Sequence, residues 1–209
     1  FGSDPNAKVT KKSKSPLSFH PIALIFGLLS FVSYLVEGAV GDWSALYLFE
    51  DKGIVIEEAV MGVMLFNGTM CIGRLLGNRL GKHLTSKQVV VGGYLLGSIA
   101  MGLIVFLPGH ASMYTYLLLG ISLAMIVPNL FSAMGEQNVI PMTQAVATST
   151  MLGYMGILMG PALIGFIAHG TSLTVAFIVL TTLLVVSAGI GKYAYHLMSK
   201  DCGLSEEQI

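Results

Sequence analysis

The sequence predicts an all-α membrane protein with six transmembrane helices, and three observations support this fold class. The chain has 209 residues, of which 54% are hydrophobic and only 11% are charged, and its mean hydropathy is +0.78. Soluble domains carry about 25% charged residues, so this composition leaves too little charge for a soluble surface. The apolar residues form six continuous runs, each near the roughly 20 residues that cross a bilayer. The 25 glycines agree with this, because small residues let membrane helices approach closely.

The six helices are joined by short polar connections. They are expected, in order, at residues 21–49, 58–78, 88–108, 113–135, 145–169 and 174–197. The domain organisation that follows is a cytoplasmic linker at 1–20, a transmembrane domain at 21–197 and a cytoplasmic tail at 198–209. Thr171 or Ser172 is placed to cap the last helix. Barrel strands are disfavoured, because they alternate apolar and polar residues over about ten positions, whereas the apolar runs here are continuous and twice that length.

The basic residues predict the orientation of the helices. With the linker inside, every lysine and arginine except Lys52 falls on the same side of the membrane. Cytoplasmic loops carry an excess of these residues, so both termini are expected in the cytoplasm. Five or seven helices would place the tail on the other side, and the charge pattern therefore supports six.

The first helix carries two carboxylates, Glu37 and Asp42, within an otherwise apolar stretch. Counted from Pro21, Glu37 lies roughly 24 Å into a core about 30 Å thick, and Asp42 lies roughly 31 Å in. Five residues separate them by about 140° on a straight helix, so they do not form a carboxylate pair. Asp42 with Trp43 is interpreted as an interfacial anchor or an outer gate. Gly38 and Gly41 are candidate positions for a break in this helix.

Polar residues follow one face of three of the predicted helices. On the first helix they are Ser30, Ser33, Tyr34, Glu37, Gly41 and Ser44; on the second Asn67, Cys71, Arg74 and Asn78; on the fourth Ser122, Asn129, Ser132 and Glu136. Such faces meet protein or water and not lipid. Two interpretations stay open. Serines alone favour a hydrogen-bonded bundle interior, whereas a stripe that contains Glu37 favours a water-filled cavity.

Several function classes are excluded or disfavoured by composition. The net charge is zero, so we expect no nucleic-acid partner. The five histidines lie near the segment ends without a metal-binding pattern, and no nucleophile elbow occurs, so we expect no enzyme, no metal and no cofactor. Cys71 lies in an apolar segment and Cys202 in the polar tail, so a disulfide is not expected, and Cys71 is expected to pack within the bundle.

Three stretches resemble those of the major facilitator superfamily. The stretch GRLLGNRLGK, residues 73–82, is similar to the cytoplasmic loop motif G-x-x-x-D-R-x-G-R-R of that family. Asn78 stands at the aspartate position, His83 replaces the last basic residue, and the leading glycine is displaced by one place. The stretch GYMGILMGPALIG, residues 153–165, resembles the Gly-Pro signature of helix 5 and its repeat partner, helix 11. The stretch DWSALYL is similar to helix 7 of the sugar-permease-like branch of bacterial permeases.

The resemblance implies a C-terminal half, helices 7–12, built as two inverted three-helix repeats. The second and fifth helices share loosely spaced glycines, as such repeats would. The implied protein is a secondary transporter in the bacterial inner membrane, surrounded by lipid, whose partners are an N-terminal six-helix half and a small-molecule substrate. A non-transporting membrane scaffold or receptor with the same bundle is the alternative.

The resemblance also implies roles for the polar residues, because the first and fourth helices of this half would line the central cavity. The residues implied to contact substrate or a coupling proton are Glu37, Tyr34, Asn129 and Asn67. The implied outer gate consists of Asp42 and Trp43, and the implied cytoplasmic gate consists of Arg74, Asn78, Arg79, Gly81 and Lys82. The residues implied to serve helix packing and bending are Gly156, Gly160, Pro161 and Gly165. Arg74 is expected near the opposite membrane face from Glu37 and out of its reach. The expected partner of Glu37 is therefore a proton or a group on the other half.

Overall fold

The computed structural model describes residues 17, 20–80, 84–137 and 139–202, and for 78–80 and 201–202 it describes the backbone alone. The secondary structure of these residues is helical throughout, as the sequence predicts. The helices are α1 (Pro21–Glu50), α2 (Ile56–Leu80), α3 (Ser86–Phe106), α4 (Gly109–Ala124), α5 (Ile126–Glu136), α6 (Met142–Gly170) and α7 (Leu173–Cys202).

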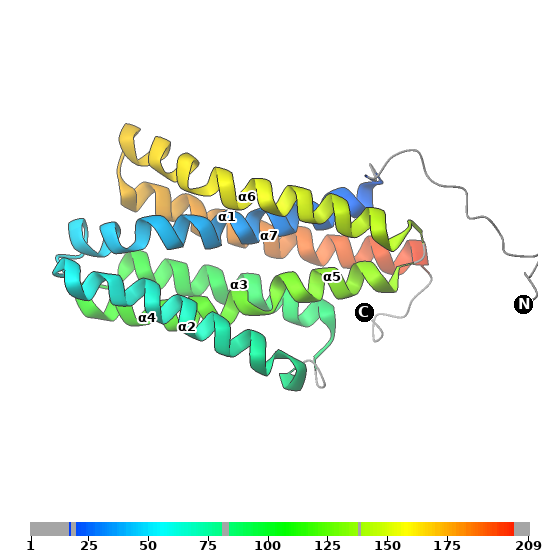
Figure 1. The fold of residues 1–209 in the computed structure, drawn as a ribbon, viewed down its shortest axis with the longest axis horizontal. Coiled ribbons are helices and arrows are strands. Elements are labelled where there is room, and N and C mark those ends of the chain that lie inside the picture. Colours follow the sequence, from blue (N-terminus) through cyan, green and yellow to red (C-terminus); the bar gives the residue numbers. More distant parts are fainter. Residues whose placement is uncertain (1–16, 18–19, 81–83, 138, 203–209) are drawn as a thin grey trace, which may run out of the picture.

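The described residues contain six helical stretches long and apolar enough to cross a membrane, in agreement with the prediction. The fourth of these stretches is formed by α4 and α5 together. In Figure 1 the helices run side by side along one axis, and the start of α1 lies at the same end as the end of α7. We call this end the terminal end. The connections α1–α2, α3–α4 and α6–α7 lie at the other end, which we call the opposite end.

The fourth span differs from the single helix expected at 113–135. It begins at Gly109 and is interrupted at Met125, between α4 and α5. The cause is Pro128, which lacks the N–H that would bond to the carbonyl of Ala124 and whose ring crowds that carbonyl. The sequence carried this signal, and the interruption lies where a mid-helix proline places it.

The structure also tests three expectations about the first and last helices: the cap of the last helix, a break in the first, and the residue at which the last helix ends. Ser172 Oγ accepts a hydrogen bond from the backbone N–H of Val175 at 3.2 Å, so the expected cap of the last helix is Ser172. The expected break at Gly38 or Gly41 is wrong, because α1 is continuous from Pro21 to Glu50. The last helix also continues past residue 197 to Cys202.

The helix contacts have the symmetry of an inverted repeat. The most extensive contacts join α1 to α6, α4 to α2, and α3 to α7. In terms of spans, the first packs on the fifth, the fourth on the second, and the third on the sixth. Exchanging spans one to three with spans four to six leaves this pattern unchanged, as expected for two inverted three-helix repeats.

The contact between α1 and α6 is made by backbone against backbone at glycines. A Cβ added at Gly160 would lie 2.5 Å from the carbonyl oxygen of Leu35, and one added at Gly38 would lie 2.8 Å from that of Ile157. Gly156 makes the same kind of approach one turn before Gly160. We call Gly38, Gly156 and Gly160 the glycine seam. Membrane helices that carry small residues at their contact can reach such short separations.

A test of the seam is the substitution Gly160→Ala. The new methyl group would overlap the Leu35 carbonyl, so the helices must separate, and overpacking of this kind costs about 1–3 kcal/mol. We expect the apparent melting temperature in detergent to fall by several degrees.

The matched control is Gly189→Ala in α7, where an added Cβ meets nothing within 4 Å. Alanine is the better helix former, so this variant should melt at the wild-type temperature or above it. Equal melting temperatures for the two variants would contradict the role of the seam.

Candidate functional site

An ion pair joins α1 to α2 in the interior of the spans. The Arg74 guanidinium donates from Nη2 to the carboxylate of Glu37, at 3.3 Å from Oε2 and 3.5 Å from Oε1. The Glu37 side chain is 24% exposed and that of Arg74 is 46% exposed. Charged side chains within membrane spans are rare and pair with one another or face water. The pair is therefore the leading candidate for a functional site.

The expectation that Arg74 lies out of reach of Glu37 is wrong. Helix α1 has 30 residues and is about 45 Å long, well over the roughly 30 Å of a hydrocarbon core. Depth counted from Pro21 therefore put Glu37 too near the far boundary. Counted from the opposite end, Glu37 lies roughly 20 Å below Glu50 and Arg74 roughly 27 Å below Ile56. The long arginine side chain spans the remaining difference.

An aromatic pair lies next to the ion pair. Tyr34 precedes Glu37 by one helical turn and stacks on Tyr154 of α6, with ring centroids 6.3 Å apart and an interplanar angle of 7°. Tyr34 is half-buried, and Tyr154 is 63% exposed. The phenol groups add polar atoms to the face that carries the Glu37 carboxylate. This face combines a carboxylate, a guanidinium and two phenols, which can hold a proton or polar groups of a solute.

The polar stripe predicted on α1 divides into two sets with different surroundings. Ser30, Ser33 and Ser44 are buried, whereas Tyr34 and Glu37 are half-buried. The two interpretations of the stripe, a hydrogen-bonded bundle interior and a water-filled cavity, thus apply to different residues of it. The serines belong to the bundle interior, and Glu37 with Tyr34 borders the exposed face.

Ser33 illustrates the interior set. Its hydroxyl lies 2.8 Å from that of Tyr94, which donates to the carbonyl of Leu29 at 2.7 Å. Because the single phenol proton is directed to Leu29, Ser33 is the donor to Tyr94. This chain of hydrogen bonds ties α3 to α1.

The two asparagines assigned to substrate or proton bind backbone carbonyls of their own helices. Asn129 donates from Nδ2 to the carbonyl of Met125 at 2.8 Å, at the interruption between α4 and α5. Asn67 is exposed and donates to the carbonyl of Val63 at 3.1 Å. Neither bond joins these residues to Glu37.

The residues assigned to the cytoplasmic gate are only partly described. Arg74 turns toward Glu37, six residues before the end of α2. Asn78 and Arg79 lie in the last turn of α2, and their side chains fall outside the described residues. Gly81 and Lys82 also lie outside them.

The residues assigned to the outer gate lie on α1 between Glu37 and the opposite end. Asp42 is exposed. Trp43 donates from its indole N–H to the carbonyl of Pro161 in α6 at 2.9 Å, and its ring covers Gly165. This bond fixes the indole against α6.

A cavity of about 380 Å³ opens beside Trp43 at the opposite end. Its polar lining includes Glu50, Asp51, His169 and Ser172. This convergence is not evident from the sequence, because the residues come from the end of α1, the last turn of α6 and the α6–α7 connection. Among the described residues, no group of three or more His, Cys, Asp or Glu side chains is placed to hold a metal ion.

Tyr154 and Cys71 were not predicted correctly from the sequence. Tyr154 was missed, because it lies in a largely apolar segment whose polar face was not traced. Cys71 is exposed on α2, so the expectation that it packs within the bundle is wrong. Helix α2 exposes one face over most of its length, including Met64, Cys71 and Leu75, and hydropathy alone does not indicate which face that is.

The ion pair can be tested by a double-mutant cycle with Glu37→Gln and Arg74→Gln. Each single change leaves one charge without its partner, so the double variant should be more stable than the sum of the single effects predicts. We expect a coupling of about 1 kcal/mol, the upper range for partly exposed pairs. The measurement is denaturant unfolding in mixed micelles.

The control cycle combines Glu37→Gln with Lys192→Gln, which removes a lysine of α7 near the terminal end. This cycle should show no coupling. Equal coupling in the two cycles would reduce the Glu37–Arg74 contact to a general charge effect.

Comparisons with known proteins find relatives that are named as a transporter and as a membrane protein. No family model matches the chain. An uncharacterized MFS-type transporter of Yersinia pestis is 41% identical over 168 residues, covering 79% of this chain and 43% of that protein. The membrane protein MosC of Rhizobium meliloti is 30% identical over 170 residues, covering 80% of this chain and 42% of its own length. Neither name describes an enzyme, in agreement with the prediction.

A solved structure shares the fold. A variant of the E. coli fucose:proton symporter FucP superposes with a TM-score of 0.72 at 16% sequence identity, over 83% of this chain and 42% of that one. At this identity the match bears on the fold alone. The chain spans less than half the length of each of these proteins, in agreement with the expectation of a half-transporter. The chain is therefore a multi-pass membrane homologue of MFS-type transporters, and it corresponds to about half of one.

Proposed function

We propose that this chain forms the C-terminal half, helices 7–12, of a secondary transporter of the bacterial inner membrane. The transporter moves a small solute by alternating access between this half and an N-terminal six-helix half. The loop motif at 73–82 and the Gly-Pro signature at 153–165 support the assignment to the C-terminal half. The 42–43% coverage of the relatives supports a second half of similar size.

The observation that carries the proposal is the partly exposed Glu37–Arg74 pair in the interior of the spans. A pair that served only to join α1 to α2 would gain nothing from exposure, because lipid solvates charge poorly. Its exposure requires water or polar protein at that depth. A cavity between two halves supplies both, and it would be bordered by Glu37, Tyr34 and Tyr154.

We propose proton coupling through this pair. A proton that binds the Glu37 carboxylate removes its charge and so releases the Arg74 guanidinium. The freed guanidinium can then bind an anionic or hydroxyl-bearing group of the solute, which arginine does well. When the proton leaves Glu37, the carboxylate competes for Arg74 and the solute is released. The solved structure of similar fold is by name a proton symporter, in line with this proposal.

Two gates complete the proposed cycle. Asp42 and Trp43 form the outer gate, where the indole bond to the Pro161 carbonyl couples α1 to α6 during closure. Asn78, Arg79, Gly81 and Lys82 form the cytoplasmic gate. Gly156, Gly160 and Gly165 allow α6 to pack closely on α1 while Pro161 permits it to bend.

The test uses proteoliposomes that contain the protein carrying this chain and a pH-sensitive dye inside. A panel of labelled sugars, sugar acids and amines is offered with an inward proton gradient. We expect one class to accumulate with acidification of the lumen. In Glu37→Gln the accumulation and the acidification should be lost, whereas exchange of labelled for unlabelled solute should persist.

The matched control is Glu58→Gln, which changes an exposed carboxylate near the start of α2, paired with His110 at 2.7 Å. This variant should transport at the wild-type rate. Wild-type accumulation in Glu37→Gln would contradict the coupling role. Absence of transport for every class in the wild-type protein would favour a membrane scaffold or receptor.

A further inference from the structure

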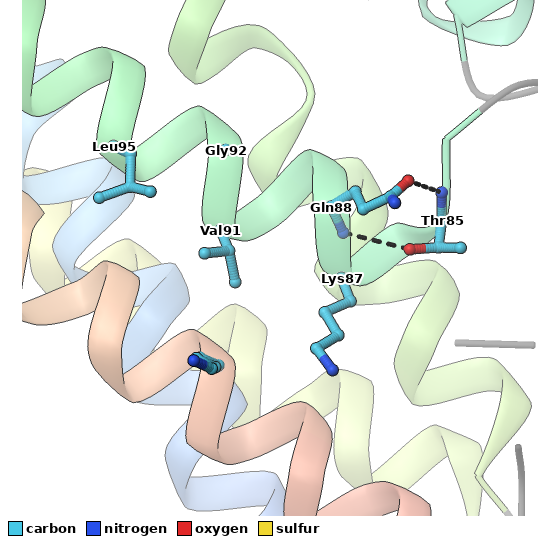
Figure 2. Close-up of a pocket in the computed structure, with 7 residues that line it drawn as sticks. Thr85, Lys87, Gln88, Val91, Gly92 and Leu95 are labelled. Atoms are coloured by element: carbon cyan, nitrogen blue, oxygen red, sulfur yellow. Dashed lines mark hydrogen bonds between the residues drawn. The ribbon is translucent and has the colours of Figure 1, made fainter. Parts of the chain in front are cut away.

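A groove lies between α3 and α7 near the terminal end of the bundle, away from the Glu37 face. Its volume is about 580 Å³. Helix α3 contributes Lys87, Val91 and Leu95, and α7 contributes Lys192. Figure 2 shows Lys87 and Val91 pointing from α3 toward the side on which α7 lies. No residue of the proposed transport site takes part in it.

Two lysines line one end of the groove. Lys87 and Lys192 approach it from two helices that are far apart in sequence. Lys87 also lies in the first turn of α3, where the helix dipole is positive and a lysine does not favour helix stability. Thr85 accepts a hydrogen bond from the backbone N–H of Gln88 at 3.3 Å, and the remaining first-turn N–H groups add to the positive potential.

The rest of the groove is apolar and open. Val91, Gly92 and Leu95 line it along the next two turns of α3. A Cβ added at Gly92 would meet nothing within 4 Å, so this glycine leaves the surface hollow without serving a helix contact. Leu95 is 47% exposed, as expected for a residue that faces lipid. The groove therefore combines an end that carries two lysines with an apolar wall that suits a hydrocarbon chain.

The position of the groove matches the boundary between headgroups and acyl chains. Lys87 lies at the start of the span Ser86–Phe106, and Lys192 lies near the end of the span Leu173–Lys200. A neighbouring hollow on α7 is lined by Lys192, Tyr193 and His196. Tyrosine and lysine concentrate at this depth of a membrane. The excess of basic residues assigns this end to the cytoplasmic leaflet, which carries anionic lipids.

We propose that the groove is a binding site for an anionic phospholipid. Lys87 and Lys192 hold the headgroup phosphate, and one acyl chain lies along Val91, Gly92 and Leu95. A free phosphate ion would use only the two lysines and would leave the apolar wall exposed to water. The length of the wall and its place within the membrane spans therefore favour the lipid. By bridging α3 and α7, the lipid would join the third and sixth spans at their cytoplasmic ends.

The experiment is lipid titration of the protein that carries this chain, in neutral detergent, followed by native mass spectrometry. Phosphatidylglycerol is compared with phosphatidylcholine, and the double variant Lys87→Gln, Lys192→Gln with the wild-type protein. Each lysine near an anionic lipid contributes about five-fold in affinity. We expect phosphatidylglycerol to bind more tightly than phosphatidylcholine, and the double variant to lose about 25-fold of that affinity.

The matched control is Lys200→Gln, which removes the same charge from the same end of α7 but does not line the groove. It should bind phosphatidylglycerol as the wild-type protein does. A second variant, Gly92→Trp, fills the apolar wall at a position where an added Cβ meets nothing within 4 Å, and it leaves both lysines intact. It should also lose the bound lipid, which keeps the test valid if the double variant fails to fold.

Three results would overturn the proposal. The first is equal affinity of the wild-type protein for the two lipids. The second is an equal loss of affinity in Lys200→Gln and in the double variant. The third is displacement of the lipid by millimolar glycerol phosphate, because competition by the free headgroup at that level would show that the apolar wall contributes nothing.

Discussion

The close approach of α1 and α6 is the constraint on which the rest of this half depends. Two carbonyls of α1, those of Phe31 and Leu35, lie directly against Gly156 and Gly160. In a bilayer there is little hydrophobic gain from bringing helices together, so contact must come from tight van der Waals packing. Any side chain at these glycines would separate the helices. The seam therefore sets the rotation of α1 and, with it, which residues of α1 are buried.

The rotation of α1 explains why the serines of its polar stripe are buried whereas Tyr34 and Glu37 are half-buried. With the seam fixed, Ser33 turns toward α3 and bonds to Tyr94, whereas Tyr34 turns toward Tyr154 on α6. Glu37 follows Tyr34 by one turn and reaches Arg74 on α2. The fourth span packs on the second span through a similar close approach at a glycine, because Gly120 lies against the backbone of Phe66. The same packing device thus operates in both repeats.

The sequence predicted what depends on run length and composition. Six spans followed from continuous apolar runs, and the placement of Lys52 at the end away from the other described basic residues followed from charge. The interruption at Met125 was predictable from Pro128, although the run of hydrophobic residues concealed it. The Glu37–Arg74 pair was not predictable in the same way. It depends on where α1 begins relative to the membrane and on the rotation set by the glycine seam, and neither is encoded in hydropathy.

The site therefore rests on packing that does not involve its charges. Helices α1 and α2 are held in place by α6 and α4, through contacts more extensive than their own. The Glu37–Arg74 pair adds one partly exposed contact between α1 and α2, and charges at this depth carry a desolvation cost. On a scaffold that is packed mainly through α6 and α4, a pair of this kind can open and close at a cost of about 1 kcal/mol. That separation of stability from charge is what a site that exchanges a proton or a solute requires.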